Sequence, residues 1–194
     1  VQIGLAYLLD KANFSQIATS LIYWFLVISF TEELFKYLVV RFKAMNSRHL
    51  DEPVDIILYM VVAALGFAAL ENILYLFSPM GQLSFNALVS RTLLVSFIRF
   101  IGATFLHTLA SAVVGYALAI SYCDEKNRTL EIAFGIFMAT LLHGIYNFSI
   151  MTLGGYLKLI VPAIVILTLA SLVFAGFEKL KKIKSVTIVE VAKT

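Results

Sequence analysis

Carboxylate, imidazole and amide side chains occur inside segments of this sequence that are otherwise apolar. Buried, a carboxylate can act as a general base, and imidazoles or an amide can bind a developing oxyanion. Together they suit hydrolysis of a peptide bond. The set comprises Glu32, Glu33 and Lys36, then Glu71 and Asn72, then Arg99 and His107, and finally His143 and Asn147.

A metal site is the second chemistry that these residue types allow. Two histidines and one glutamate are the ligands of many catalytic zinc sites, which keep one position open. Zinc is therefore the one cofactor to consider, with His107, His143 and Glu71 as candidate ligands. Because such ligands would come from separate segments, no local HExxH motif is available to test this alternative.

Helical spacing gives the acidic pair different surroundings. Glu32 and Lys36 are four residues apart, which permits an ion pair on one helical face. Glu33 lies about 100° further round, with no cation nearby in sequence. Of the two glutamates, Glu33 is thus expected to be the unpaired one.

These side chains must be held by membrane-spanning helices. Hydrophobic residues make up 61% of the 194 residues and charged residues only 14%, about half of what soluble domains carry. Apolar runs near the twenty residues that cross a bilayer predict five spans, at about residues 17–42, 54–77, 100–122, 130–152 and 156–177. Residues 86–98 are either an extension of the third span or an interfacial segment, and residues 1–9 fit the end of a further helix.

The predicted fold is therefore all-α, a polytopic transmembrane bundle. We expect one membrane-embedded domain over residues 1–184 and a short tail over 185–194. At about 1.5 Å rise per residue, Glu33, His143, His107 and Glu71 lie roughly 14 to 25 Å from one end of their spans, so they can meet in a buried layer. Gly66, Ala64 and Ala68 in the second span are expected to be helix contacts.

Basic residues gather in three short loops or flanks, and this sets the expected orientation. They are Arg41, Lys43 and Arg48, then Lys126 and Arg128, and then Lys179, Lys181, Lys182 and Lys184. The positive-inside rule places these sites, and hence the C-terminus, in the cytoplasm of a multi-pass cell-membrane protein. The basic residues form no long tract, so the net charge of +3 does not indicate a nucleic-acid partner.

The ordered motifs resemble the PrsW family of intramembrane proteases, which is similar to the CAAX-prenyl endopeptidases. The resemblance spans residues 31–148 and rests on the Glu32-Glu33 pair, Gly66 to Asn72, Arg99 to His107, and His143 to Asn147. It implies cleavage of membrane-anchored, single-span proteins, typically anti-sigma factors. The stretch from Asp55 to Gly66 departs from the family pattern because it lacks most of the usual small residues.

The resulting hypothesis is an intramembrane endopeptidase of glutamic or metallo type. Glu33 or Glu32 would activate water, His107 and His143 would bind the oxyanion or a metal, and Asn147 would orient the reacting groups. The supporting residues would be Lys36, Glu71, Asn72 and Arg99. A non-catalytic membrane scaffold and a proton-coupled transporter are the alternatives, and the latter predicts internally repeated halves that the sequence does not contain.

Overall fold

A computed structural model describes residues 2–11, 14–47, 50–76, 84–123 and 126–181. All regular elements in these ranges are helices, as the sequence predicts. Five are long and apolar enough to cross a membrane, namely Gln16–Ala44, Pro53–Leu76, Phe85–Tyr122, Arg128–Thr152 and Leu157–Leu180. The tail expected over residues 185–194 lies outside the described residues, as do Arg48, Lys182 and Lys184.

The first span is one helical rod with two wider π-helical segments. It runs through α2 (Gln16–Ile22), η1 (Tyr23–Phe30), α3 (Thr31–Val39) and η2 (Val40–Ala44). Two hydroxyl groups stabilise the end of η1, because Ser29 Oγ donates to the Trp24 carbonyl at 2.8 Å and Thr31 Oγ1 donates to that of Val27 at 2.6 Å. Segments of π-helix occur often at functional sites, and here one ends directly before the Glu32-Glu33 pair.

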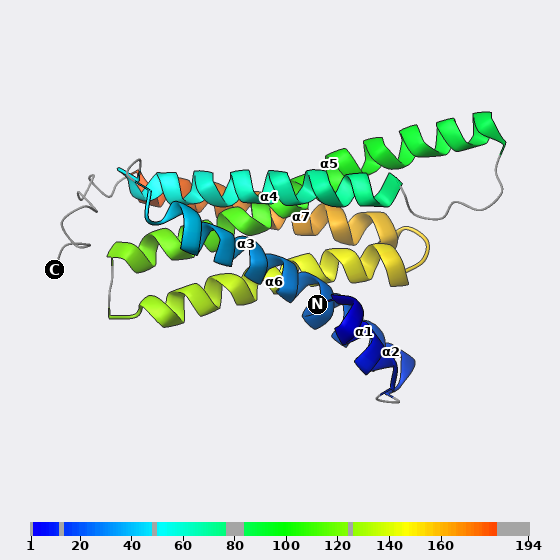
Figure 1. The fold of residues 1–194 in the computed structure, drawn as a ribbon, viewed down its shortest axis with the longest axis horizontal. Coiled ribbons are helices and arrows are strands. Elements are labelled where there is room, and N and C mark those ends of the chain that lie inside the picture. The colour runs from blue at the N-terminus through cyan, green and yellow to red at the C-terminus, as the bar shows by residue number, and fades with distance from the viewer. Residues whose placement is uncertain (1, 12–13, 48–49, 77–83, 124–125, 182–194) are drawn as a thin grey trace.

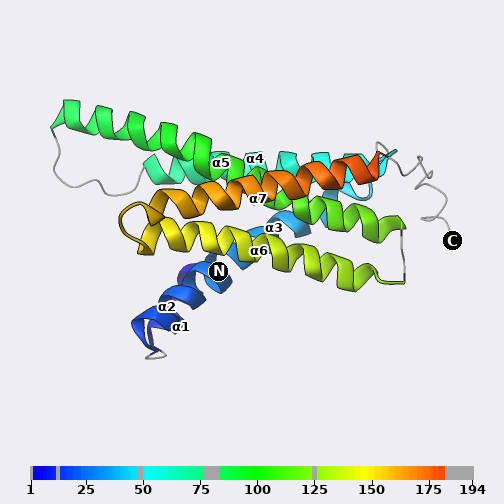
Figure 2. The same cartoon turned by 180° about the vertical axis from the view of Figure 1, so that it is seen from behind.

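The remaining spans are α4 (Pro53–Leu76), α5 (Phe85–Cys123), α6 (Arg128–Thr152) and α7 (Leu157–Leu180). Their predicted bounds are confirmed within three residues, except that α5 begins at Phe85, so residues 86–98 extend the third span. In Figure 1, α4, α6, α7 and the later part of α5 run side by side, while the first span crosses them obliquely. Seen from behind in Figure 2, α7 passes in front of the middle of α5, which it contacts.

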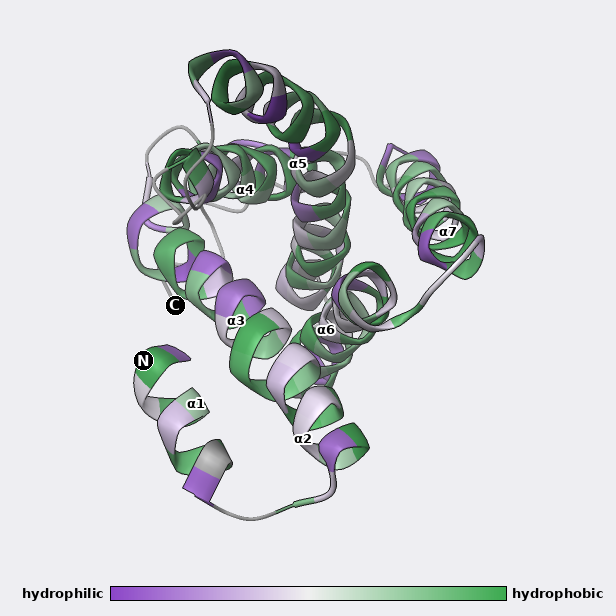
Figure 3. Cartoon of the chain, turned by 90° about the vertical axis from the view of Figure 1, so that its right-hand side faces the viewer, coloured by the Kyte–Doolittle hydropathy of each residue, from purple (hydrophilic) through white to green (hydrophobic). Residues whose placement is uncertain are grey.

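A short helix, α1 (Gln2–Lys11), packs beside η1. Its ten residues are too few to cross the bilayer alone. The helical character expected for residues 1–9 is confirmed for residues 2–9. Figure 3 shows α1 on the outside of the bundle, across from α4 and next to the first span.

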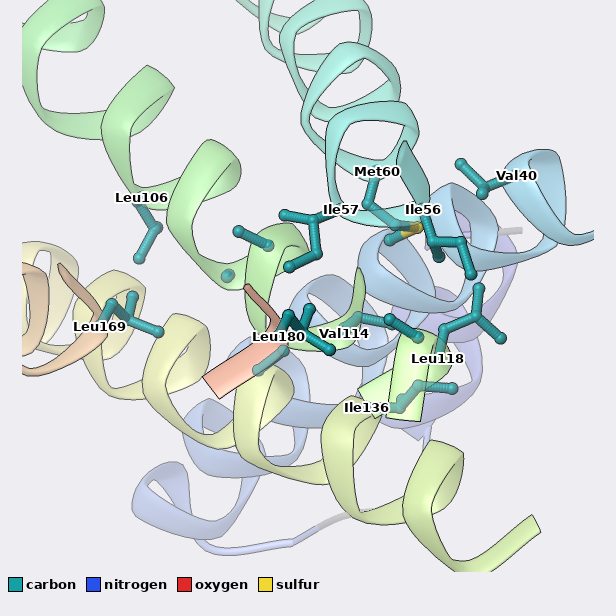
Figure 4. Close-up of a cluster of buried hydrophobic side chains, with 14 of the residues drawn as sticks. Val40, Ile56, Ile57, Met60, Leu106, Val114, Leu118, Ile136, Leu169 and Leu180 are labelled. Carbon is teal, nitrogen blue, oxygen red and sulfur yellow. The ribbon is translucent and has the colours of Figure 1, made fainter. Parts of the chain in front are cut away.

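An apolar core packs the long helices against one another. Ile56, Ile57 and Met60 of α4 are at most 1% exposed and meet Val114 and Leu118 of α5, as Figure 4 shows. At Gly115 a Cβ atom would lie 2.9 Å from Ile57 Cα, so glycine permits this close approach of α4 and α5.

Small residues of α4 only partly follow the expectation. Ala64 and Ala68 are buried as helix contacts. Gly66 is exposed, and a Cβ added to it would meet no neighbouring atom within 4 Å, so its expected role as a helix contact is wrong. The cause is rotation: a residue two positions from both buried alanines points about 200° away from each.

Candidate active site

Glu33 is a fully enclosed carboxylate with three hydrogen-bond donors. It is 0% exposed. Its Oε1 accepts from Lys36 Nζ at 2.7 Å and from His143 Nδ1 at 2.9 Å, and its Oε2 accepts from Ser111 Oγ at 3.0 Å. The expectation that Lys36 pairs with Glu32 and leaves Glu33 unpaired is therefore wrong. Lys36 makes its ion pair at i,i+3, because Glu33 lies on the face toward α5 and α6, where the Ser111 and His143 donors also point.

His107 connects that group to a second carboxylate. Its Nδ1 lies 2.8 Å from Lys36 Nζ and its Nε2 lies 2.8 Å from Glu71 Oε2. An ammonium group only donates, so Nδ1 accepts from Lys36 and Nε2–H donates to Glu71. Both ring nitrogens of His107 are thereby engaged.

Arg99 contacts Glu71 at the same carboxylate oxygen as His107. Its guanidinium lies 3.0 Å from Glu71 Oε2 and donates to Asn72 Oδ1 at 2.9 Å. The guanidinium also stacks 3.5 Å from the centroid of the Tyr75 ring, and Asn72 in turn donates to Thr104. Arg99 and Asn72 therefore position Glu71 and do not reach the glutamate pair.

Glu32 differs from Glu33 in having one oxygen without a donor. Its Oε1 accepts from Gln2 Nε2 at 3.1 Å, whereas its buried Oε2 has no hydrogen-bond partner among the described residues. That oxygen lies 3.7 Å from His143 Nε2 and 4.0 Å from His107 Nδ1. A buried oxygen without a partner is costly unless something else binds there.

A metal ion fits this position. One donor atom each of Glu32, His107 and His143 lies within 4.8 Å of the others. Two ligands at about 2.1 Å on a tetrahedral ion are roughly 3.4 Å apart, so donor atoms up to 4.8 Å apart would have to move together by up to about 1.4 Å. His143 is already oriented, because Nδ1–H donates to Glu33 and leaves the Nε2 lone pair facing Glu32.

The third candidate ligand, His107, is less available to a metal than His143. His107 Nδ1 holds the Lys36 hydrogen bond, so a metal at this atom requires Lys36 Nζ to release it. This set also differs from the expected one, because Glu71 is not in it. Glu71 stands behind His107 as its hydrogen-bond acceptor, the usual position of a carboxylate that orients a ligating histidine.

A cavity of about 720 Å³ gives access to these groups. Glu32, Glu71, His107, His143 and Asn147 all line it. Asn147 is half-buried, and no hydrogen bond to its amide occurs in the described part of the chain. The structure thus brings every sequence-predicted site residue either to the cavity wall or directly behind it.

Three contributors were not predicted from the sequence. Ser111 lies four residues after His107, so helical periodicity alone was a signal for it. Phe67, four residues before Glu71, places its ring 4.6 Å from Lys36 Nζ and 5.4 Å from the His107 ring. Gln2 of α1 had no local signal, because its contact with Glu32 spans thirty residues.

Comparison with known proteins identifies the family of this chain. The model of the PrsW family of intramembrane metalloproteases matches residues 2–175. Protease PrsW of Bacillus subtilis is 31% identical over 95% of this chain and 77% of its own length. The proteins of that name from Oceanobacillus iheyensis and Shouchella clausii are 31% and 32% identical over 76% and 84% of this chain, which spans 63% and 69% of their lengths. No solved structure gives a significant match.

Proposed function

Because this chain belongs to the PrsW family of intramembrane metalloproteases, we propose that it hydrolyses a peptide bond of single-span, membrane-anchored proteins such as anti-sigma factors. The observation that carries the proposal is the unpartnered Glu32 Oε2, buried beside two histidine nitrogens at the wall of a cavity. Peptide hydrolysis needs water, a base and a group that stabilises negative charge, and this position can provide all three.

Glu32, His107 and His143 are the residues that would hold a divalent metal such as zinc. When bound, such an ion supplies Lewis-acid polarisation of the substrate carbonyl and lowers the pKa of water. Its binding also compensates the Glu32 carboxylate, which forms no ion pair with a lysine or arginine in the described part of the chain.

The protein's own groups position the reaction. Glu33 fixes the tautomer of His143, and Glu71 fixes that of His107, so both imidazoles keep one orientation. Asn147 offers an amide N–H from the cavity wall to a substrate oxygen. Glu33 has three donors and no exposure, so the water-activating role passes from Glu33 to Glu32.

Glu32→Gln tests the proposal in reconstituted vesicles with a tagged single-span anti-sigma factor as substrate. Cleavage should fall by at least about a hundredfold, as expected when a general base or an essential ligand is removed. Glu131→Gln is the matched control, because Glu131 on α6 also has a buried carboxylate oxygen without a partner but lines a different cavity. Full activity in Glu32→Gln would refute the assignment.

Metal content then distinguishes whether Glu32 acts as a metal ligand or as the general base. Elemental analysis of unchelated protein should find about one divalent ion per wild-type chain. Loss of the ion in Glu32→Gln identifies a ligand, and an inactive variant that retains it identifies a base. A wild-type protein that is active without any metal would refute the metal site and leave the glutamate mechanism.

A further inference from the structure

The cavity reaches from the polar groups to the lipid-facing surface. Phe35 of α3 and Leu70 and Leu74 of α4 line it, yet these side chains are 48%, 57% and 59% exposed. Glu32, at 5% exposure, lines the same space. A continuous path thus runs from the outside of the bundle to the unpartnered carboxylate oxygen. Its outer wall is apolar.

Helix divergence creates this opening. The first span packs against α4 through α3 and η2. Before that contact, η1 and α2 swing away from α4, as Figures 1 and 3 show. The short helix α1 packs beside η1 in this region. The exposed side chains of Phe35 on α3 and Leu70 on α4 place one mouth of the cavity on the lipid-facing side, between these two helices.

The size of the cavity limits what it can hold. An α-helix with its side chains is about 10 to 12 Å across, so one 5.4 Å turn occupies roughly 500 Å³. A cavity of about 720 Å³ accepts less than two such turns, whereas a membrane span needs about twenty residues. A membrane-spanning partner can place only a short, locally unwound segment inside, with the rest of its span in lipid.

A carboxamide already occupies the inner end of the path. Gln2 Nε2 of α1 donates to Glu32 Oε1 at 3.1 Å and to Thr31 Oγ1 at 3.3 Å. A primary amide and a peptide group present the same kinds of donor and acceptor. The acceptors that hold the Gln2 carboxamide are thus suited to a backbone N–H of an unwound peptide.

We propose that the transmembrane segment of a membrane-anchored protein enters sideways between α3 and α4, and that its backbone N–H displaces the Gln2 carboxamide from Glu32 and Thr31. This inference rests on the proposed protease function and specifies its substrate path. Gln2 acts as a placeholder that satisfies Glu32 Oε1 while no substrate is bound.

Photocrosslinking locates the path. A photoreactive amino acid replaces Leu70 at the opening or, as control, Leu167 of α7, which is 67% exposed and lines none of the cavities described above. Each variant is mixed in vesicles with a tagged single-span anti-sigma factor. We expect a crosslinked product from position 70 at least about ten times as abundant as from position 167. Equal yields, or a higher yield from 167, overturn the sideways path.

Cleavage is followed in the same vesicles, which separates the two proposals. Crosslinking at position 70 without cleavage by the wild type supports the path and refutes the protease assignment. Cleavage without crosslinking at position 70 supports the protease and refutes the path. Absence of both refutes both.

Gln2→Ala tests the placeholder. Removing a competing hydrogen-bonded group should lower KM by roughly two- to tenfold and leave kcat unchanged. If Gln2 instead served to hold Glu32 in place, kcat would fall and KM would stay the same. That result would overturn the displacement step, whereas the position-70 crosslink would still report on the path.

Discussion

At the residue scale, two adjacent glutamates differ because their neighbours differ. Glu33 collects three donors from three helices, while Glu32 Oε2 has none among the described residues. Buried ionised groups are tolerated when they are paired and hydrogen-bonded. Glu33 therefore has the environment of a supporting group and Glu32 that of a reactive or ligating one.

Lys36 is the cation on which this arrangement depends. Lys36→Met leaves the Glu33 carboxylate buried without the Lys36 countercharge, which should lower the free energy of unfolding by about 3 to 5 kcal/mol. Lys181→Met is the matched control, because Lys181 and Glu178 form an i,i+3 pair at 3.0 Å with the lysine side chain 63% exposed. An exposed pair contributes about 1 kcal/mol or less.

Thermal unfolding in detergent compares the stabilities of the Lys36 and Lys181 variants with that of the wild type. The Lys36 variant should melt several degrees below the wild type and the Lys181 variant close to it. Equal melting temperatures for all three proteins would mean that Lys36 does not stabilise the Glu33 site.

At the element scale, close helix approach depends on particular small residues. A Cβ at Gly135 of α6 would overlap Ala117 Cβ of α5, and no other atom outside its own helix lies within 3.4 Å of it. Helix pairs in membranes use small residues to bring their backbones together. This contact helps to hold α6, and hence His143, against α5.

Gly135→Ala should therefore destabilise the protein by about 1 to 3 kcal/mol through overpacking. Adding Ala117→Gly removes the opposing methyl group and should restore most of the loss. Gly66→Ala serves as control, since a Cβ there would meet no neighbouring atom within 4 Å. Denaturation in mixed micelles checks the series, and a double variant no better than Gly135→Ala would contradict this packing.

At the scale of the whole molecule, several basic residues lie near helix ends at one end of the bundle. Figure 1 places the C-terminal end of α7, the N-terminal end of α6 and the end of η2 at one end of the bundle. The described basic residues near those ends are Arg41, Lys43, Lys126, Arg128, Lys179 and Lys181. The tight turn before α7, with Gly155 at φ 58°, lies at the other end. This pattern predicts a cytoplasmic C-terminus.

Cysteine labelling in intact cells tests the orientation. With the single cysteine, Cys123, replaced by alanine, Tyr156→Cys should react with a membrane-impermeant maleimide, because Tyr156 is 85% exposed in the outer turn. Glu52→Cys, exposed before α4, should react only after the cells are opened. The reverse labelling pattern would invert the topology and place the basic ends outside.

The sequence by itself determined the helical class, the five spans and the set of polar residues that the fold gathers at the candidate site. These follow from apolar run length and from the cost of burying charge in a bilayer, both of which are local properties. The extension of α5 to Phe85 was left open because Arg91, exposed on that helix, interrupts an otherwise apolar run.

Only the tertiary structure decided how the polar residues are paired. Spacing along one helix allowed Lys36 to reach Glu32 or Glu33, and the choice came from Ser111 and His143 on other helices. Likewise, Glu71 orients His107 because its Oε2 accepts from His107 Nε2–H, and Arg99, on the same helix as His107, lies 3.0 Å from that oxygen. Hydrogen-bond partners on separate helices are set by how the helices pack in three dimensions. The spacing of residues along any one helix does not determine that packing.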